Sequence, residues 1–130
     1  RDMQRRRNMA MIVVTHDLAA VAALAERVAV LYGGEIVEEE PATEIYHRPL
    51  HPYTYGLIGS IPAVARGRLR FIPGEAPRLV DTDHRVCVFA DRCEFATAVC
   101  RAEAPRPRPV GGSSVACHHA HTLDLPGVGS

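Results

Sequence analysis

The sequence lacks several features that would place it in a common functional class. It contains no tryptophan, its aromatic content is 5%, and its formal net charge is +0. These values give no support to nucleic-acid binding, which normally relies on a basic surface and on aromatic stacking. No apolar run is long enough to span a bilayer. The basic opening over residues 1–7 is not followed by the apolar core and cleavage site of a secretory signal, so we expect a cytoplasmic protein.

Over its 130 residues, the sequence has the proportions of hydrophobic and charged residues that are ordinary for a globular protein. Hydrophobic residues make up 47% and charged residues 23%, which allows one packed domain, or one domain and a piece of another. The first residue is Arg1, and residues 1–9 have the composition of the charged end of a helix. We therefore expect the chain to start inside a larger domain.

A short strand followed at once by a helix opens the predicted secondary structure. Met11 to Val14 is an apolar run typical of a parallel strand that is buried on both faces. Residues 18–25 carry apolar side chains at helical spacing, and Thr15 or Asp17 can cap this helix. His16 thus follows the carboxyl end of a strand and precedes a helix N-terminus, a place where α/β proteins bind ligands and phosphate. Alone, the pattern is weak, because most histidines at strand ends are structural.

A hairpin and two short helices are predicted next. Gly33-Gly34 is a two-residue turn of the kind that hairpins favour, and Pro52 suits the first turn of a helix. Charged residues before Pro41 are expected to end the hairpin. The predicted elements are strands over residues 27–32 and 35–38 and helices over residues 42–47 and 51–62.

Beyond residue 63 the composition changes. Proline, glycine and arginine become frequent, periodicity weakens, and every cysteine lies between residues 84 and 121. We therefore divide the chain into three parts. They are the end of an α/β domain over residues 1–41, a helical segment over residues 42–65 and a cysteine-rich extension over residues 66–130.

Three stretches resemble the C-terminal part of the ATPases of a known family. The run from Val13 to Leu18, which includes Thr15-His16-Asp17, and the run from Ala25 to Glu38 resemble the tail of an ATP-binding cassette (ABC) ATPase domain. Residues 45–62, with His51-Pro52-Tyr53 at their centre, closely resemble the His-Pro-Tyr segment of oligopeptide and dipeptide importer ATPases. The implied fold class is α/β, the C-terminal edge of a P-loop NTPase domain followed by a small, loop-rich cysteine module.

The resemblance implies a role for His16 and a set of partners. His16 matches the switch histidine, which contacts the γ-phosphate of ATP across a dimer of ATPase domains, and an imidazole can both donate to and accept from phosphate and water. ATP and Mg²⁺ would act in the complete parent domain, with a second ABC ATPase subunit and transmembrane permease subunits as partners. The implied location is the cytoplasmic face of the cell membrane. Tyr53, Leu57 and Ile58 match positions that we expect to pack in the core.

The family's other catalytic motifs are missing from the sequence. ATP hydrolysis needs a glycine-rich loop with lysine and Ser/Thr, a signature loop, an acidic strand end for magnesium and a catalytic glutamate. The only Gly-Gly pairs are Gly33-Gly34 and Gly111-Gly112, and neither belongs to a lysine-bearing loop. We therefore predict that this chain alone neither binds ATP well nor hydrolyses it.

Four cysteines predict a metal centre in the extension. They are separated by five, six and sixteen residues, at Cys87, Cys93, Cys100 and Cys117. Disulfides are disfavoured in the expected compartment, and zinc usually takes pairs of cysteines two to four residues apart, which are absent here. A four-iron, four-sulfur (4Fe-4S) cluster suits the wider spacing. The C-terminal extension of the same importer ATPases is similar, and some members bind such a cluster, so we place the cluster ahead of zinc.

Other residues of the extension have secondary roles in this interpretation. Phe89 and Phe95 would shield the cysteines from water, and Arg92 and Arg101 could offset cluster charge or be ordinary surface residues. The four nearby histidines are interpreted as surface residues or as hydrogen-bond donors to the ligands, and they are His84, His118, His119 and His121. A structural role for the cluster and a redox or iron-linked regulatory role both stay open.

The main alternative is a stand-alone iron–sulfur or zinc module with a regulatory or electron-carrying role. A reading frame that extends upstream through a phosphate loop and a signature motif would favour the importer ATPase instead. The substrate stays open between dipeptides, oligopeptides and nickel-type ligands, because importer specificity lies mainly in other subunits.

Overall fold

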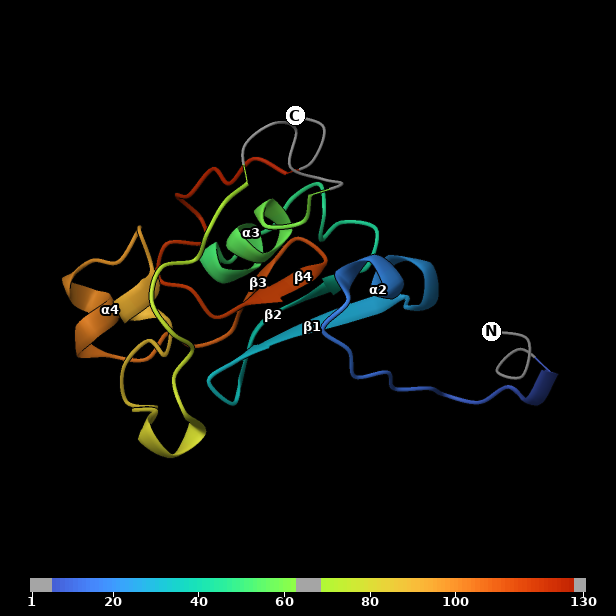
Figure 1. Cartoon of the computed structure of the whole chain (residues 1–130), viewed down its shortest axis with the longest axis horizontal. Helices are drawn as coiled ribbons and strands as arrows, with labels where there is room; N and C mark the ends of the chain where they lie inside the picture. The colour runs from blue at the N-terminus through green and yellow to red at the C-terminus, as the bar shows by residue number, and fades with distance from the viewer. Residues whose placement is uncertain (1–5, 63–68, 128–130) are drawn as a thin grey trace.

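The computed structural model describes residues 6–62 and 69–127, which form a four-stranded antiparallel sheet with short helices around it (Figure 1). The strand order is β1-β2-β4-β3. The elements, in chain order, are α2 (Leu18–Leu24), β1 (Arg27–Tyr32), β2 (Glu35–Pro41), α3 (Pro52–Gly59), α4 (Ala98–Ala102), β3 (Arg108–Val110) and β4 (Ser113–Val115). Within the described residues, no helix has the length and apolar character needed to cross a membrane.

The hairpin of β1 and β2 forms as its sequence predicts. Gly33 and Gly34 make the turn with φ angles of 57° and 84°, a backbone conformation that glycine adopts without steric cost. β4, which comes from the cysteine-rich extension, pairs with the other edge of β2 through Glu38↔Val115 and Glu39↔Ser114. The extension thus shares a sheet with the hairpin, although more than seventy positions separate the paired residues in sequence.

A bulge in β2 sets which of its side chains are buried. Alternate residues of β1 from Val28 to Tyr32 are buried. The register shifts halfway along the strand pair, so that Val37 is an extra residue in β2. Glu38 and Glu40 consequently lie opposite two buried valines and share their face of the sheet. Two carboxyl groups are therefore directed into the protein.

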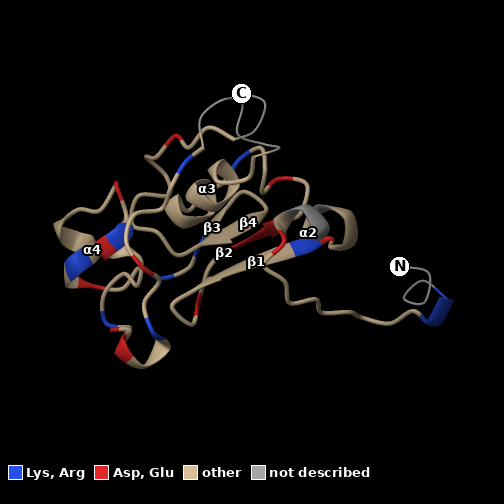
Figure 2. Cartoon of the chain, viewed as in Figure 1, with Lys and Arg blue, Asp and Glu red and all other residues tan. Residues whose placement is uncertain are grey.

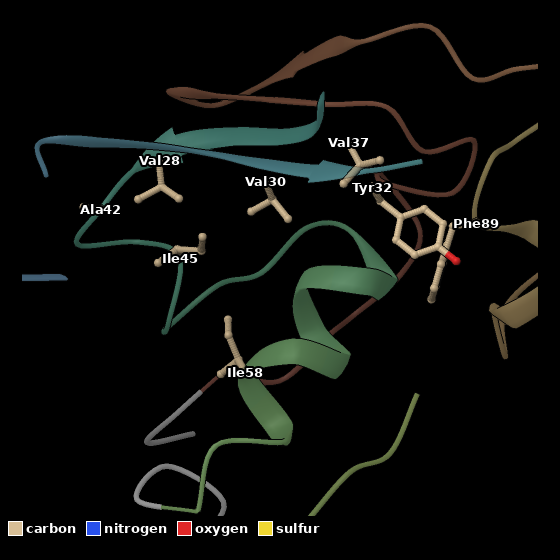
Figure 3. Close-up of a cluster of buried hydrophobic side chains, with 8 residues drawn as sticks. All are labelled: Val28, Val30, Tyr32, Val37, Ala42, Ile45, Ile58 and Phe89. Atoms are coloured by element: carbon tan, nitrogen blue, oxygen red, sulfur yellow. The ribbon is translucent and has the colours of Figure 1, made fainter. Parts of the chain in front are cut away.

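The main core lies between this face of the sheet, the segment that follows β2, and α3. In Figure 3 the side chains of β1 point toward Ile45 and toward Ile58 of α3, and Tyr32 points toward Phe89. The predicted core positions are confirmed, because Ile58 is buried and Tyr53 and Leu57 are packed against the core. A second, smaller cluster of Leu50, Val115, Cys117 and Ala120 joins the extension to the start of α3.

The prediction of a buried strand over residues 11–14 is wrong for the described structure. This segment forms no strand, and Ile12 and Val14 are 93% and 96% exposed. It leads away from the sheet toward the N-terminus in Figure 1. A parallel strand is held by neighbours on both sides, and the described residues supply none here.

Two further predictions of secondary structure differ from the structure. Residues 42–47 form consecutive turns in place of a helix, with the amide N–H groups of Glu44 and His47 donating to carbonyl groups three residues earlier. β2 runs on to Pro41 and does not end at Glu38, because the bulge and the pairing with β4 accommodate its acidic residues. The helices predicted from residues 18 and 51 are confirmed as α2 and α3.

Candidate functional site

His16 lies in an exposed bend directly before α2. The Thr15 hydroxyl accepts a hydrogen bond from the Asp17 amide at 3.0 Å, which shapes this bend locally. α2 is held against the core through Leu18 and Val21, and the Tyr46 hydroxyl donates to the carbonyl oxygen of Leu18. A histidine is thus presented to solvent at the start of an anchored helix.

The His-Pro-Tyr segment owes its fold to a helix cap. The backbone of His51 is extended, and its ring Nδ1 accepts a hydrogen bond from the Tyr53 amide at 3.0 Å. Pro52 occupies the first turn of α3, where a missing N–H group carries no cost. Burial lowers the pKa of His51 to about 3, so the imidazole is neutral and Nδ1 stays free to accept. The motif is therefore a structural device that starts α3.

Glu38 fixes the same helix start to the sheet. Its Oε1 accepts from the Leu50 amide at 2.7 Å and its Oε2 from the His51 amide at 2.9 Å. Both amide groups precede the helix and have no partner within it. Sequence reasoning missed Glu38, because the acidic run was interpreted as the end of the strand. No local signal marked Glu38, because its burial depends on the bulge in β2 and on the pairing of β2 with β4.

An aromatic cluster joins three parts of the chain near this cap. The Phe89 ring lies 5.0 Å from the Tyr32 ring in an edge-on arrangement and 5.4 Å from the Tyr53 ring. The Tyr32 and Tyr53 rings are 4.6 Å apart. These residues come from β1, α3 and the segment between the first two cysteines. The cluster therefore holds the cysteine segment against the hairpin.

The four predicted metal ligands approach one another from separate parts of the extension. The Cys87 amide donates to the Cys100 carbonyl oxygen at 2.9 Å. The other three cysteines each raise the pKa of Cys93 through repulsion between thiolate charges. All four are free cysteines, and Cys100 and Cys117 are buried.

Burial makes Cys87, Cys93 and Cys117 poor acids by themselves. It raises the pKa of Cys93 and of Cys117 to about 11, and it also raises the pKa of Cys87. Backbone amides oppose this effect, because N–H groups of Phe89, Phe95 and His119 point at the three sulfur atoms and favour the thiolate. Such donors suit sulfur atoms that carry negative charge, and a nearby cation would be needed to hold several thiolates together.

The surrounding residues have partners of their own. His119 Nε2 lies 2.9 Å from the Thr97 hydroxyl and 3.5 Å from the Cys100 sulfur, whereas His118 contacts the Glu103 carbonyl and His84 pairs with Glu35. Arg92 donates to the carbonyl oxygens of Pro73 and Gly74, and Arg101 pairs with Asp91. Phe89 is buried and Phe95 is half-buried. Among these histidines, His119 has a ring nitrogen in contact with a cysteine sulfur, that of Cys100.

In the part of the chain that the structure describes, no group of three or more His, Cys, Asp or Glu side chains is arranged to hold a metal ion. Three of the four cysteines therefore receive amide donors, while the described side chains form no metal site.

The segment that contains the His-Pro-Tyr cap matches a known protein family. Residues 37–100, which run from the bulge of β2 to Cys100, match the family described as the oligopeptide/dipeptide transporter C-terminal region. The chain is thus a relative of the ATP-binding proteins of peptide transporters, and it carries the C-terminal region that is typical of them.

Individual relatives agree along nearly the whole chain. It is 43% identical over 119 residues to a putative peptide import ATP-binding protein of Brucella abortus. It is 41% identical over 119 residues to the dipeptide transport ATP-binding protein DppD of Haemophilus influenzae, and 39% identical over 121 residues to DppD of Escherichia coli. These alignments cover 91%, 90% and 91% of this chain. They cover 35%, 36% and 37% of the relatives, so the chain spans about a third of their length.

Proposed function

We propose that this chain is the C-terminal part of the ATP-binding subunit of an ABC peptide importer. The observation that carries the proposal is the extent of similarity, which covers 91% of the chain at 43% identity to a putative peptide import ATP-binding protein. In this role the subunit couples ATP hydrolysis to peptide uptake. It acts at the cytoplasmic face of the membrane with a second ATPase subunit and permease subunits.

His16 is the proposed switch histidine of that subunit. Its exposure, and its position directly before α2, support a role in contacting a group supplied by another segment or subunit. When ATP and Mg²⁺ are bound in the complete domain, they supply the phosphate and its counter-charge, and His16 would position the γ-phosphate. The exposed apolar segment before it would become a strand when the rest of an ATPase sheet lies beside it.

The first prediction tests His16 in the product of the complete reading frame that contains this chain. We expect Mg²⁺-dependent ATP hydrolysis, reduced by about a hundredfold in His16→Ala, since positioning and charge stabilisation carry this reaction. His47→Ala, which changes another exposed histidine, should keep full activity. The 130-residue chain alone should not hydrolyse ATP. Activity in this chain alone, or equal activity of His16→Ala and the parent, would contradict the proposal.

We further propose that the four cysteines bind a 4Fe-4S cluster, chiefly as a structural cross-link. Two observations support this choice: each of the other three cysteines acts on the charge of Cys93, and amide groups point at three of the sulfur atoms. A bound cluster would supply the positive charge that holds the thiolates and would order the loop-rich segment.

The second prediction concerns this cluster. Chain purified without oxygen should be brown and should contain about four iron atoms and four acid-labile sulfides. Cys100→Ser should lose the visible absorbance and most of the iron, whereas His118→Ala should keep both, because its imidazole contacts a carbonyl group away from the sulfurs. A colourless parent chain with one zinc ion would show that this assignment is wrong and would favour the zinc alternative.

A further inference from the structure

Two glutamates on β2 are almost completely buried without a basic partner. Glu38 and Glu40 are each 1% exposed, although carboxylates are rarely buried to this extent unless they are paired. Within residues 6–62 and 69–127, neither takes part in an ion pair. Figure 2 shows the acidic colour on β2 in the middle of the fold, where β1, β4 and α3 surround it. Neither residue is among the proposed ATP contacts or cysteine ligands, although the charge of Glu38 helps to raise the pKa of Cys117.

The two carboxyl groups differ in how their oxygens are satisfied. Glu38 accepts two amide hydrogen bonds at the start of α3, which suits a charged carboxylate. Glu40 has one bond of 3.3 Å, from the Ser113 hydroxyl of β4 to its Oε2. Its Oε1 is buried and receives no hydrogen bond from any group in the described residues. An ionised Glu40 would therefore leave a charged oxygen buried without a partner, next to a second carboxylate.

A proton on Glu40 removes both the buried charge on an unpartnered oxygen and the repulsion between two neighbouring carboxylates. The side chains of Glu38 and Glu40 are close enough to share a hydrogen bond, so a protonated Glu40 can donate to Glu38 while still accepting from Ser113. We propose that Glu40 carries a proton in the folded chain, and that loss of this proton loosens the docking of β4 and α3 on β2. The pair is then a pH-sensitive joint between the hairpin and the cysteine-rich extension.

The groups that face Glu40 support this protonation. Burial and the charge of Glu38 raise the pKa of Glu40 to about 8, and Glu44 in the turn after β2 raises it further. The Ser113 hydroxyl on β4 acts in the opposite direction. From α3, Thr54 faces Glu38 with its buried hydroxyl but completes no well-formed hydrogen bond. His51 at the helix cap is neutral because burial lowers its pKa. No cation therefore faces Glu40 from these elements.

The sign of the pH dependence follows from linkage. Glu40 has a pKa of about 8 in the folded chain and 4.5 as its ordinary value, so the folded state holds a proton that the unfolded state has released. Its contribution to stability is complete below pH 4.5, and it is lost as pH rises toward 8. Across this window the folding equilibrium constant should fall by about tenfold per pH unit. His51 acts in the opposite direction below about pH 6.5, so a comparison between variants is needed.

The third prediction compares the full chain with Glu40→Gln, whose amide mimics a protonated carboxyl group. Urea unfolding is measured from pH 5 to pH 8, under one reducing buffer, for both proteins. The ratio of their folding equilibrium constants removes the contributions of His51 and the thiols. It reports on Glu40 together with its neighbour Glu38, whose pKa burial also raises. We expect this ratio to shift by up to a hundredfold between pH 6 and pH 8 in favour of Glu40→Gln. Glu39→Gln is the control, since Glu39 is half-exposed and pairs with Arg27, and its ratio should stay constant.

A second measurement reports on the proton itself. The infrared band of a protonated carboxyl group should be present in the parent chain at pH 6.5, should vanish near pH 9, and should be missing in Glu40→Gln. A pH-independent stability ratio, or no protonated carboxyl band at pH 6.5, would overturn the proposal. Should Glu40→Gln fail to fold, Glu40→Ala and the infrared band of the parent chain still decide it.

Discussion

Glu38→Ala is expected to lower the free energy of unfolding by about 3–5 kcal/mol, near the upper range for a single substitution. The carboxylate of Glu38 receives the amide protons of Leu50 and His51 at the start of α3. Alanine would leave both amides buried without an acceptor, and each unsatisfied group costs about 1–3 kcal/mol. Urea unfolding near neutral pH measures the effect, and faster hydrogen exchange at the Leu50 and His51 amides would locate it.

Two variants on the same strand sharpen this test. Glu38→Gln retains one carbonyl acceptor, so we expect a loss between that of alanine and zero. Glu39→Ala removes a half-exposed ion pair with Arg27, and such pairs contribute about 0–1 kcal/mol. If Glu38→Ala proved no more damaging than Glu39→Ala, the described anchoring of α3 would be wrong.

Local sequence signals predicted the elements that are determined by interactions between residues close together in the chain. The glycine pair gave the hairpin turn because two successive residues there have positive φ angles. Pro52 and the preceding histidine gave the start of α3, because a cap and a first-turn proline act within a few residues. The core positions on α3 followed from the same helix.

Features that depend on distant residues were missed or misjudged. The apolar run at residues 11–14 has strand composition, yet a parallel strand requires neighbours that the described residues do not provide. The burial of Glu38 and Glu40 depends on a bulge and on pairing with β4, neither of which leaves a periodic pattern in the sequence. An acidic run was therefore interpreted as a strand end, whereas tertiary contacts make it part of the interior.

In the candidate site, too, the sequence indicated features that depend on nearby residues and missed those that depend on distant ones. Spacing and resemblance identified His16 and the four cysteines as residues of interest, and their roles stay predictions. Spacing could not indicate that a phenylalanine between the first two cysteines would pack against tyrosines of β1 and α3. That packing, together with the pairing of β4 with β2, is how the extension is attached to the rest of the chain. Loss of this buried aromatic side chain should therefore weaken the attachment.

Phe89→Ala is accordingly expected to destabilise the chain by about 3–5 kcal/mol. Phe89 is 3% exposed, and its ring contacts those of Tyr32 and Tyr53 at the junction of hairpin, helix and cysteine segment. Truncation would remove buried apolar surface and leave a cavity beside the cap of α3. Because the segment after Cys87 would lose its main apolar anchor, protease cleavage between residues 87 and 100 should precede global unfolding.

The matched control is Phe71→Ala, which truncates the same side chain where it is 84% exposed. We expect this change to stay within about 0.5 kcal/mol of the parent chain, as surface substitutions usually do. Phe89→Leu, which keeps much of the buried volume, should recover a large part of the lost stability. Equal effects of Phe89→Ala and Phe71→Ala would mean that the aromatic cluster contributes little to the attachment of the extension.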